Sequence, residues 1–212
     1  MSKFFSLYGE RLLIAVGTHF MYVFVSVSIA FVIALLLGIF LSRSPRFAGI
    51  ILPILSIFQT IPGIVFLGLL FLKLGMIPAT VITALSIYAI FPILKNTYVG
   101  LIEVPEENRE AAKGCGMSAF QSLVRVELPL ALPTIISGLR MSVVYTVSWA
   151  VLAAMIGLGG LGEFIYTGIG SNNNTLILAG AIPSAVMAIV LSQLTDLLRK
   201  KLIPKPLRRD LK

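Results

Sequence analysis

Two aromatic residues, Tyr145 and Trp149, stand four positions apart in an apolar stretch of the 212-residue chain. In a helix this spacing places both side chains on one face. Aromatic faces attract cations, and they commonly hold a quaternary ammonium group, which has no N–H to donate. The pair therefore indicates a contact surface for a cationic solute, with packing between helices as the alternative for each residue.

Other polar and aromatic residues interrupt the apolar stretches in the same way. A buried polar group needs a hydrogen-bond partner or water, so we expect some of these side chains to line a path for a solute. Packing between helices and anchoring at the membrane interface are the alternatives. The candidate path residues are Gln59, Tyr88, Asn96, Tyr145, Ser148 and Trp149.

The chain offers little material for catalysis or metal binding. It contains one histidine, His19, and one cysteine, Cys115. A catalytic site needs a nucleophile, a base and an orienting group, and a single histidine cannot hold a metal alone. We therefore expect no enzyme activity, no metal site and no cofactor in this chain. We expect His19 at the membrane interface and Cys115 as a small filler in a helical turn.

A glycine-rich segment, GLGGLGE, follows one of the apolar stretches. It has a superficial likeness to the GxGxxG nucleotide-binding pattern, but that pattern should follow a strand, and the phosphate loop GxxxxGK[ST] is absent from the sequence. Any ATP hydrolysis must therefore take place on another chain. Glycine permits backbone conformations that other residues resist, so we expect a compact outer turn or gate formed by Gly157, Gly159, Gly160 and Gly162.

The elements that position these residues are membrane helices. Hydrophobic residues make up 58% of the chain and charged residues only 12%. A helix needs about 20 apolar residues to cross a bilayer. Five spans meet this length, at about 19–41, 49–73, 78–101, 133–156 and 176–198. The sequence thus predicts an all-α integral membrane protein with an N-terminal segment at 1–18, a transmembrane domain at 19–198 and a basic tail at 199–212.

The second predicted span contains Pro62 and Gly63. Proline interrupts a helix, so this span is either one kinked helix or two short pieces. Neither piece is long enough to cross the membrane alone. We favour one broken helix.

Lysine and arginine indicate the orientation of the spans, because they collect on the cytoplasmic side. Arg43 and Arg46 follow the first span, and the tail at 199–212 carries seven cations, whereas residues 157–175 carry none. The polar hairpin at 103–132 and the C-terminus are therefore predicted to be cytoplasmic, and the N-terminus to lie outside. The formal net charge of +8 is explained by this orientation, so we expect no binding of nucleic acid.

The polar hairpin has signals for two short helices. Gly116 suits the end of the first helix, and Ser118 and Gln121 have the spacing of a capping box that starts the second. Pro129 predicts that the second helix ends before it. From this pattern alone, the hairpin is either a docking element for another protein or a solvated connector.

One part of this hairpin is similar to the EAA loop of ABC importer permeases. The matching residues are Glu110, Ala111, Ala112, Gly116, Leu128 and Pro129, with Val126 in place of the usual isoleucine. Other stretches resemble the osmoprotectant branch of this family: QTIP at 59–62, FPILKNTYVGL at 91–101, VELPLALP at 126–133 and GLGGLGEFIYTGI at 157–169. The resemblance implies a type I ABC importer transmembrane domain, whose hairpin is the coupling helix that sits in a cleft of the ATPase.

The resemblance also implies a function and partners. The chain is expected to be a permease subunit in the bacterial cytoplasmic membrane that forms the path for glycine betaine, carnitine or choline. The implied partners are ABC ATPase subunits, a second identical or similar permease, and an extracellular or periplasmic solute-binding protein. One alternative is a type I permease for another small solute. Another is an ion-coupled secondary transporter, which usually needs carboxylates inside its spans; Asp196 is the nearest such residue.

Overall fold

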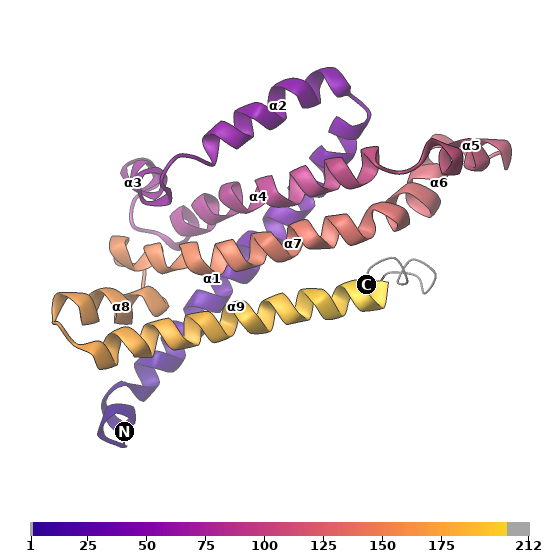
Figure 1. The fold of residues 1–212 in the computed structure, drawn as a ribbon. Helices are drawn as coiled ribbons and strands as arrows, with labels where there is room; N and C mark the ends of the chain where they lie inside the picture. The colour runs from indigo at the N-terminus through magenta and orange to yellow at the C-terminus, as the bar shows by residue number, and fades with distance from the viewer. Residues whose placement is uncertain (1, 203–212) are drawn as a thin grey trace.

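The computed structural model describes residues 2–202, and every regular element in that range is helical (Figure 1). The predicted all-α fold is confirmed. The helices are α1 Ser2–Ser42, α2 Pro45–Phe58, α3 Gly63–Leu74, α4 Pro78–Ile102, α5 Glu106–Gly114, α6 Ala119–Ser122, α7 Leu128–Ala150, α8 Leu161–Gly170 and α9 Asn174–Leu202. A π-helical turn spans Leu123–Glu127 and a 3₁₀ turn spans Val151–Ile156. Most of the predicted basic tail, residues 203–212, lies outside the described residues.

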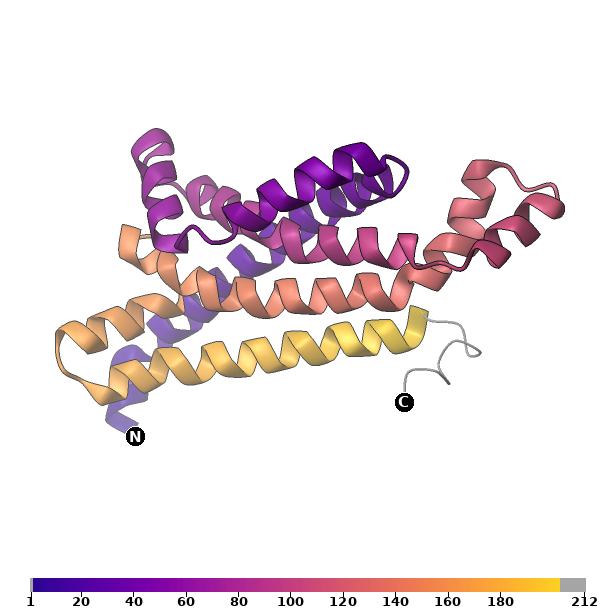
Figure 2. The ribbon, with the colours of Figure 1, turned by 45° about the horizontal axis from the view of Figure 1, so that its top comes forward.

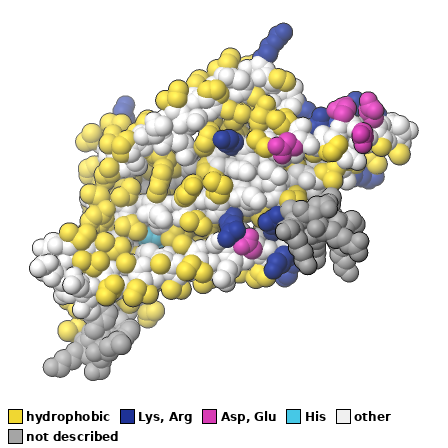
Figure 3. Space-filling model, in the orientation of Figure 1, with side chains coloured by type: hydrophobic (Ala, Val, Ile, Leu, Met, Phe, Trp, Pro, Cys, Tyr) yellow, Lys and Arg dark blue, Asp and Glu magenta, His cyan; other side chains and the backbone are white. Residues whose placement is uncertain are grey.

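Three long helices, α4, α7 and α9, run side by side, and α1 crosses behind them (Figures 1 and 2). The α5–α6 hairpin projects from one end of this bundle, near the end of α9. We call this the hairpin end. The opposite end carries α8 and the start of α1. In Figure 3, charged side chains gather over the hairpin and near the end of α9, whereas hydrophobic side chains cover most of the remaining face.

Small residues allow the central helices to approach closely. A Cβ added at Gly38 of α1 would lie 2.6 Å from the Thr97 side chain of α4, and one added at Gly138 of α7 would lie 2.6 Å from that of Asn96. These distances are shorter than any normal contact. Interfaces between membrane helices favour small residues because packing, rather than hydrophobic burial, holds the helices together. Glycine at these two positions therefore sets the spacing of α1, α4 and α7.

The helices account for all five predicted spans. Four helical segments are long and apolar enough to cross a membrane, and α2 with α3 forms a bent pair that can serve as a fifth. The boundaries of the first span were predicted wrongly, because residues 2–18 are not a separate segment but the start of α1. The charged pair Glu10 and Arg11 interrupts the apolar pattern there without ending the helix.

The second span is broken at the predicted position. Helices α2 and α3 meet at an angle of 93° across residues 59–62. Pro62 lies in extended conformation, with ψ of 128°, immediately before α3. The residue that precedes a proline avoids the helical region, which explains why the helix stops here. With 14 and 12 residues, neither piece reaches the length of about 20 residues that a span requires.

The prediction that the second hairpin helix ends before Pro129 was wrong. Helix α6 continues through the π-helical turn into α7, where the N–H of Leu128 bonds to the carbonyl of Leu123. Pro129 falls in the first turn of α7, directly after the π-helical turn, and such a π-bulge is a common irregularity inside a continuous helix. The hairpin is therefore joined to the fourth span without a loop.

His19 is completely buried, so its predicted place at the membrane interface was wrong. Its ring Nε2 lies 3.0 Å from the carbonyl oxygen of Val147, and the N–H of Leu161 points to Nδ1 at 3.4 Å. Since α1 begins at Ser2, position 19 falls inside the bundle. The histidine therefore joins α1 to α7 and to the start of α8.

Candidate functional site

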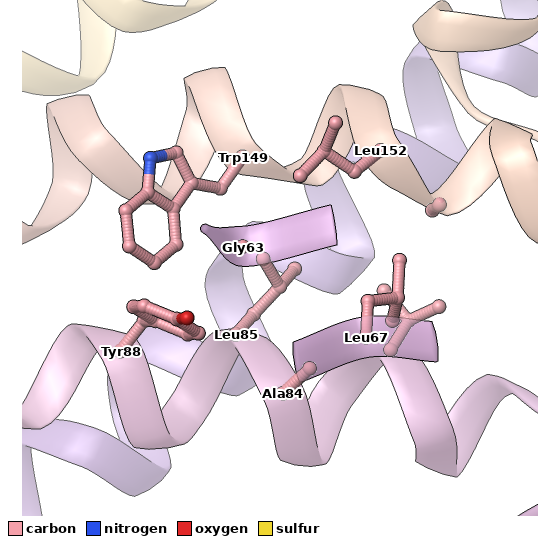
Figure 4. Close-up of a pocket in the computed structure, with 9 residues that line it drawn as sticks. Gly63, Leu67, Ala84, Leu85, Tyr88, Trp149 and Leu152 are labelled. Atoms are coloured by element: carbon pink, nitrogen blue, oxygen red, sulfur yellow. The ribbon is translucent and has the colours of Figure 1, made fainter. Parts of the chain in front are cut away.

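Aromatic side chains from three elements meet around Tyr88 of α4. The centroid of its ring lies 3.8 Å from that of Trp149 on α7 in an edge-to-face arrangement, and the two side chains lie next to each other in Figure 4. Phe66 of α3 and Phe58 of α2 lie 5.4 Å and 5.8 Å from the Tyr88 ring. The separations from Phe66 and Phe58 are typical of favourable aromatic pairs, and the Tyr88–Trp149 contact is closer than these. The cluster therefore connects the broken span to α4 and α7.

Two hydrogen bonds fasten the break between α2 and α3 to α4. The side-chain amide of Gln59 donates to the carbonyl of Tyr88 at 2.8 Å, and the Tyr88 hydroxyl donates to the carbonyl of Ile61 at 2.7 Å. A break in a helix leaves backbone groups without helical partners, and such groups need other partners when they are buried. Tyr88 thus contributes an aromatic ring to the cluster and hydrogen bonds to the residues at the break.

Four of the six candidate path residues line one small hollow beside this cluster. Gln59, Tyr88, Tyr145 and Trp149 surround it together with Leu85 and Thr146, and its volume is about 10 Å³. A single water molecule needs at least that much space. The hollow therefore has no room for an organic solute in this conformation.

The other two candidates lie elsewhere. The side chain of Asn96 donates to the carbonyl of Pro92 at 2.8 Å and packs against Gly138. Ser148 is exposed, and its hydroxyl donates to the carbonyl of Val144 at 3.2 Å. Each side chain is satisfied by its own helix. Their contacts favour packing for Asn96 and give no support to a shared role with the aromatic cluster.

A larger hollow of about 550 Å³ lies between α1, α7 and α9. Its volume falls in the range of ligand pockets, about 300–1,000 Å³. Apart from Ser28 and Thr195, its lining residues are aliphatic or aromatic, and none of the candidate path residues belongs to it. Size alone therefore does not identify this hollow as the path.

The glycine-rich segment is not a simple turn, because it leads into α8. Gly157, Gly159 and Gly160 have φ values of 73°, 72° and 79°, so the predicted unusual backbone conformations are present there. Gly162 differs, since it lies in α8 and packs directly against the backbone of Val151. At this end Arg11 of α1 also forms a 2.6 Å ion pair with Glu163 of α8. The segment is a packed structural unit at the end opposite the hairpin.

The hairpin has the predicted helix signals. Gly116, the second residue after α5, has φ of 76°. The Ser118 hydroxyl accepts from the Gln121 N–H at 3.3 Å, and the Gln121 side chain accepts from the Ser118 N–H at 2.9 Å. This is a complete capping box. Cys115 lies at the end of α5, but its side chain is exposed and fills no internal space.

The residues of the EAA pattern divide between the tip and the base of the hairpin. Glu110, Ala111 and Gly116 are exposed at the tip, whereas Ala112 is buried against the hairpin itself. Leu128 and Pro129 are half-buried at the base, where α7 begins. The pattern thus marks both an exposed surface and the point at which that surface is attached to a span.

Phe120 was not among the predicted site residues, although it is the single aromatic residue of the hairpin and its side chain is exposed. Its relative exposure is 73%, and that of Val124 one turn later is 44%. Contiguous exposed apolar side chains mark sites of contact with proteins or membranes. The apolar stripe of the second hairpin helix was the sequence signal for this surface.

Two charged residues, both partly exposed, pair between α7 and α9. Arg140 and Asp196 form an ion pair at 3.6 Å, and Arg140 also donates to the hydroxyl of Ser192 at 2.8 Å. Charged residues in membrane segments commonly pair with one another. The carboxylate nearest to the middle of a span therefore has an arginine as its partner.

Comparisons with known proteins agree with this arrangement. Residues 14–208 match the family of binding-protein-dependent transport system inner membrane components. The chain is 39% identical to the carnitine transport permease protein OpuCB of Listeria monocytogenes, across 97% of this chain and 94% of that protein. It is 35% identical to the glycine betaine/carnitine/choline transport system permease protein OpuCB of Bacillus subtilis, across 98% and 96% of the two chains. The resemblance to osmoprotectant permeases is confirmed.

A solved structure gives the same fold. The chain superimposes on a chain of the MetNI methionine ABC transporter, in an inward-facing conformation, with a TM-score of 0.81, 22% identity, and coverage of 91% of this chain and 96% of the other. The predicted type I ABC importer fold is therefore confirmed. The chain belongs to the family of binding-protein-dependent transport system inner membrane components and is a multi-pass permease subunit of the cytoplasmic membrane, not an enzyme.

Proposed function

We propose that this chain forms the translocation path of an ATP-driven importer for a quaternary-ammonium osmoprotectant: glycine betaine, carnitine or choline. Relatives that share 39% and 35% of its residues over nearly their whole lengths carry names with these solutes. The observation that carries the proposal within the structure is the meeting of Tyr88, Tyr145 and Trp149 beside the break in the second span.

The chemistry of this cluster suits a cation without hydrogen-bond donors. The hollow has no acidic side chain in its lining, so attraction for a cation comes from the aromatic faces. Trp149 is half-buried and the Tyr145 side chain is half exposed, which leaves ring surface available on the side away from α4. The passage of a solute requires α7 and the α2–α3 break to separate.

The proposed partners are ABC ATPase subunits, a second permease that is identical or similar, and a separate solute-binding protein. The hairpin supplies the ATPase contact, because Ala111 presents a small side chain and Phe120 an apolar one on its exposed surface. The segment at 157–163 supplies a gate on the outer side. No ATP is hydrolysed on this chain.

An ion-coupled transporter is the less favoured alternative. Such a mechanism needs a carboxylate that can exchange a proton or cation within the span. Asp196 instead lies 3.6 Å from the guanidinium of Arg140, so its carboxylate is engaged in an ion pair. A type I permease for a different small solute remains the alternative within the family.

Uptake measurements test the proposal. The chain is reconstituted in vesicles with its ATPase and solute-binding protein, and uptake of glycine betaine, carnitine and choline is compared with uptake of a neutral amino acid. Trp149→Ala is expected to lower uptake of the favoured solute about tenfold, which corresponds to a lost cation–π contact of about 1–2 kcal/mol. Ser148→Ala, one position away, serves as the control and should leave uptake unchanged.

Two outcomes contradict this assignment. If Trp149→Ala and Tyr145→Ala both transport every tested osmolyte normally at native abundance, the aromatic residues only pack the helices. If none of the three quaternary ammonium compounds stimulates ATP hydrolysis, the solute class is wrong.

A further inference from the structure

A buried carboxylate lies at the base of the hairpin. Glu127 is the last residue of the π-helical turn that joins α6 to α7, and only 4% of its side chain is exposed. Removing a carboxylate from water is costly unless cations or hydrogen bonds compensate for the lost hydration. The groups around Glu127 therefore determine how firmly this junction is held.

Three groups from three different segments meet the Glu127 carboxylate. The guanidinium of Arg43, in the turn between α1 and α2, lies 2.7 Å from Oε1. The guanidinium of Arg109, on the first hairpin helix α5, lies 3.4 Å from Oε2. The hydroxyl of Ser122 donates to Oε1 at 3.3 Å. One carboxylate thus connects the α1–α2 turn, the hairpin and the start of α7.

Arg109 extends these connections to a fourth element. It donates to the carbonyl of Leu101 in the last turn of α4 at 2.6 Å, and it contacts Glu106 of its own helix at 3.3 Å. The hairpin is therefore held at its base to both spans that flank it in sequence. It is also held through Glu127 to the turn that directly precedes the broken span.

The connection to Arg43 matters because α2 is otherwise held loosely. Ala48 is the only fully buried residue of α2. At its other end, α2 leads into the break whose Gln59 side chain and Ile61 carbonyl bond to Tyr88. A movement of the hairpin that is transmitted through Arg43 therefore acts directly on the helix that ends at the aromatic cluster.

We propose that Glu127 is a positioning residue that transmits movement of the hairpin to the broken span through its ion pairs with Arg109 and Arg43. The inference rests on the proposed function of the hairpin as the ATPase contact. Without these ion pairs the hairpin can follow the ATPase while α2 stays in place. ATP hydrolysis then continues with less transport.

The test measures solute molecules transported per ATP hydrolysed, in vesicles that contain the permease, its ATPase and the solute-binding protein. The variants are Glu127→Gln, Arg43→Gln and the two combined. Each single variant is expected to lower this ratio by roughly fivefold, the low end of typical coupling between sites. Because both changes break the same contact, the combined variant should be no worse than Glu127→Gln alone.

Arg46→Gln is the matched control. Arg46 is an exposed arginine three residues after Arg43, and no ion pair is present for it among residues 2–202. This variant should keep the native ratio. Arg43→Lys keeps the positive charge, so it should transport more solute per ATP hydrolysed than Arg43→Gln. A contribution of Arg43 that does not depend on its charge predicts no such difference between the lysine and glutamine variants.

Glu127 is buried, so Glu127→Gln can reduce the amount of folded protein. If it does, the result for Arg43→Gln decides whether the inference holds. Arg43 is almost half exposed, and its loss leaves Glu127 facing Arg109. If Arg43→Gln reduces transport and hydrolysis in equal proportion, or leaves both unchanged, the inference is overturned. If the native complex neither binds the ATPase nor couples hydrolysis to uptake, the proposed function fails instead.

Discussion

The turns after α5 and before α8 have the same backbone arrangement in different surroundings. In the first, the N–H groups of Gly116 and Met117 bond to the carbonyls of Lys113 and Ala112; in the second, those of Gly157 and Leu158 bond to Ala154 and Ala153. Both glycines have positive φ, 76° and 73°. This is the Schellman motif, which commonly ends a helix.

What surrounds the two glycines differs. A Cβ at Gly116 would meet nothing within 4 Å, whereas one at Gly157 would overlap the terminal methyl of Met76. The segment near α8 is thus packed against its own chain, while the hairpin turn is open. Within this chain a substitution at Gly116 affects only the backbone, so any larger loss of function there must come from a partner.

The largest effect is expected at Gly162, on the packed side of the comparison. It lies within α8 in ordinary helical conformation, and a Cβ there would overlap the carbonyl of Val151. Gly162→Ala should lower the free energy of unfolding by about 1–3 kcal/mol through overpacking. Thermal unfolding in detergent measures the change. Gly170→Ala, at an open position in the same helix, should be close to native; equal stability of both variants contradicts the packed interpretation.

The next effect is expected at Gly116, on the open side. Gly116→Val forces a β-branched residue into positive φ, which costs about 1–2 kcal/mol. The variant should insert and pair with a second permease, yet lose ATPase association or most solute-stimulated hydrolysis. Co-purification with the ATPase and hydrolysis assays measure both. Gly114→Ala, two residues earlier in helical conformation, is the control and should keep activity. Normal transport by the Gly116→Val complex would show that the hairpin is only a connector.

A smaller loss is expected for Ala111→Asp, which places a larger charged group at the exposed tip of the hairpin. Folding should be unaffected, because the side chain points away from the hairpin core around Ala112. Affinity for the ATPase should fall, and the amount of ATPase that co-purifies measures it. Ala111→Ser, which is small and neutral, is the control. If the Ala111→Asp and Ala111→Ser variants co-purify with equal amounts of ATPase, the exposed surface around Ala111 does not contact the ATPase.

The smallest effect is expected from cysteine labelling, which leaves transport activity unchanged. It tests whether the turn at Gly116 and the region after α8 lie on opposite sides of the membrane. Cys115, beside Gly116, should resist an impermeant thiol reagent in whole cells. A cysteine at Ser171, after α8, should react in a Cys115→Ser background. Both side chains are exposed in the structure, so accessibility depends on the side. Labelling of Cys115 from outside overturns the predicted orientation.

The sequence was sufficient for features that depend on local physics. Hydropathy predicted five spans, since each must cover the same bilayer thickness, and the structure has four long apolar helices and a bent pair that can serve as the fifth. The capping box at Ser118, the break before Gly63 and the turn at Gly116 follow from the preferences of single residues. The EAA pattern and neighbouring stretches indicated the family, which the comparisons confirm.

Only the tertiary structure decided the features that depend on distant residues. Periodicity did not reveal that α1 begins at Ser2, and so His19 was placed at the interface rather than between α1, α7 and α8. Pro129 predicts a helix end, but the preceding π-helical turn lets it start α7 instead. Glu127 reads as a loop carboxylate, although Arg43 lies 84 positions away in sequence and 2.7 Å away in space. Burial and ion pairing result from the packing of whole helices. A local sequence pattern does not indicate which helices pack against each other.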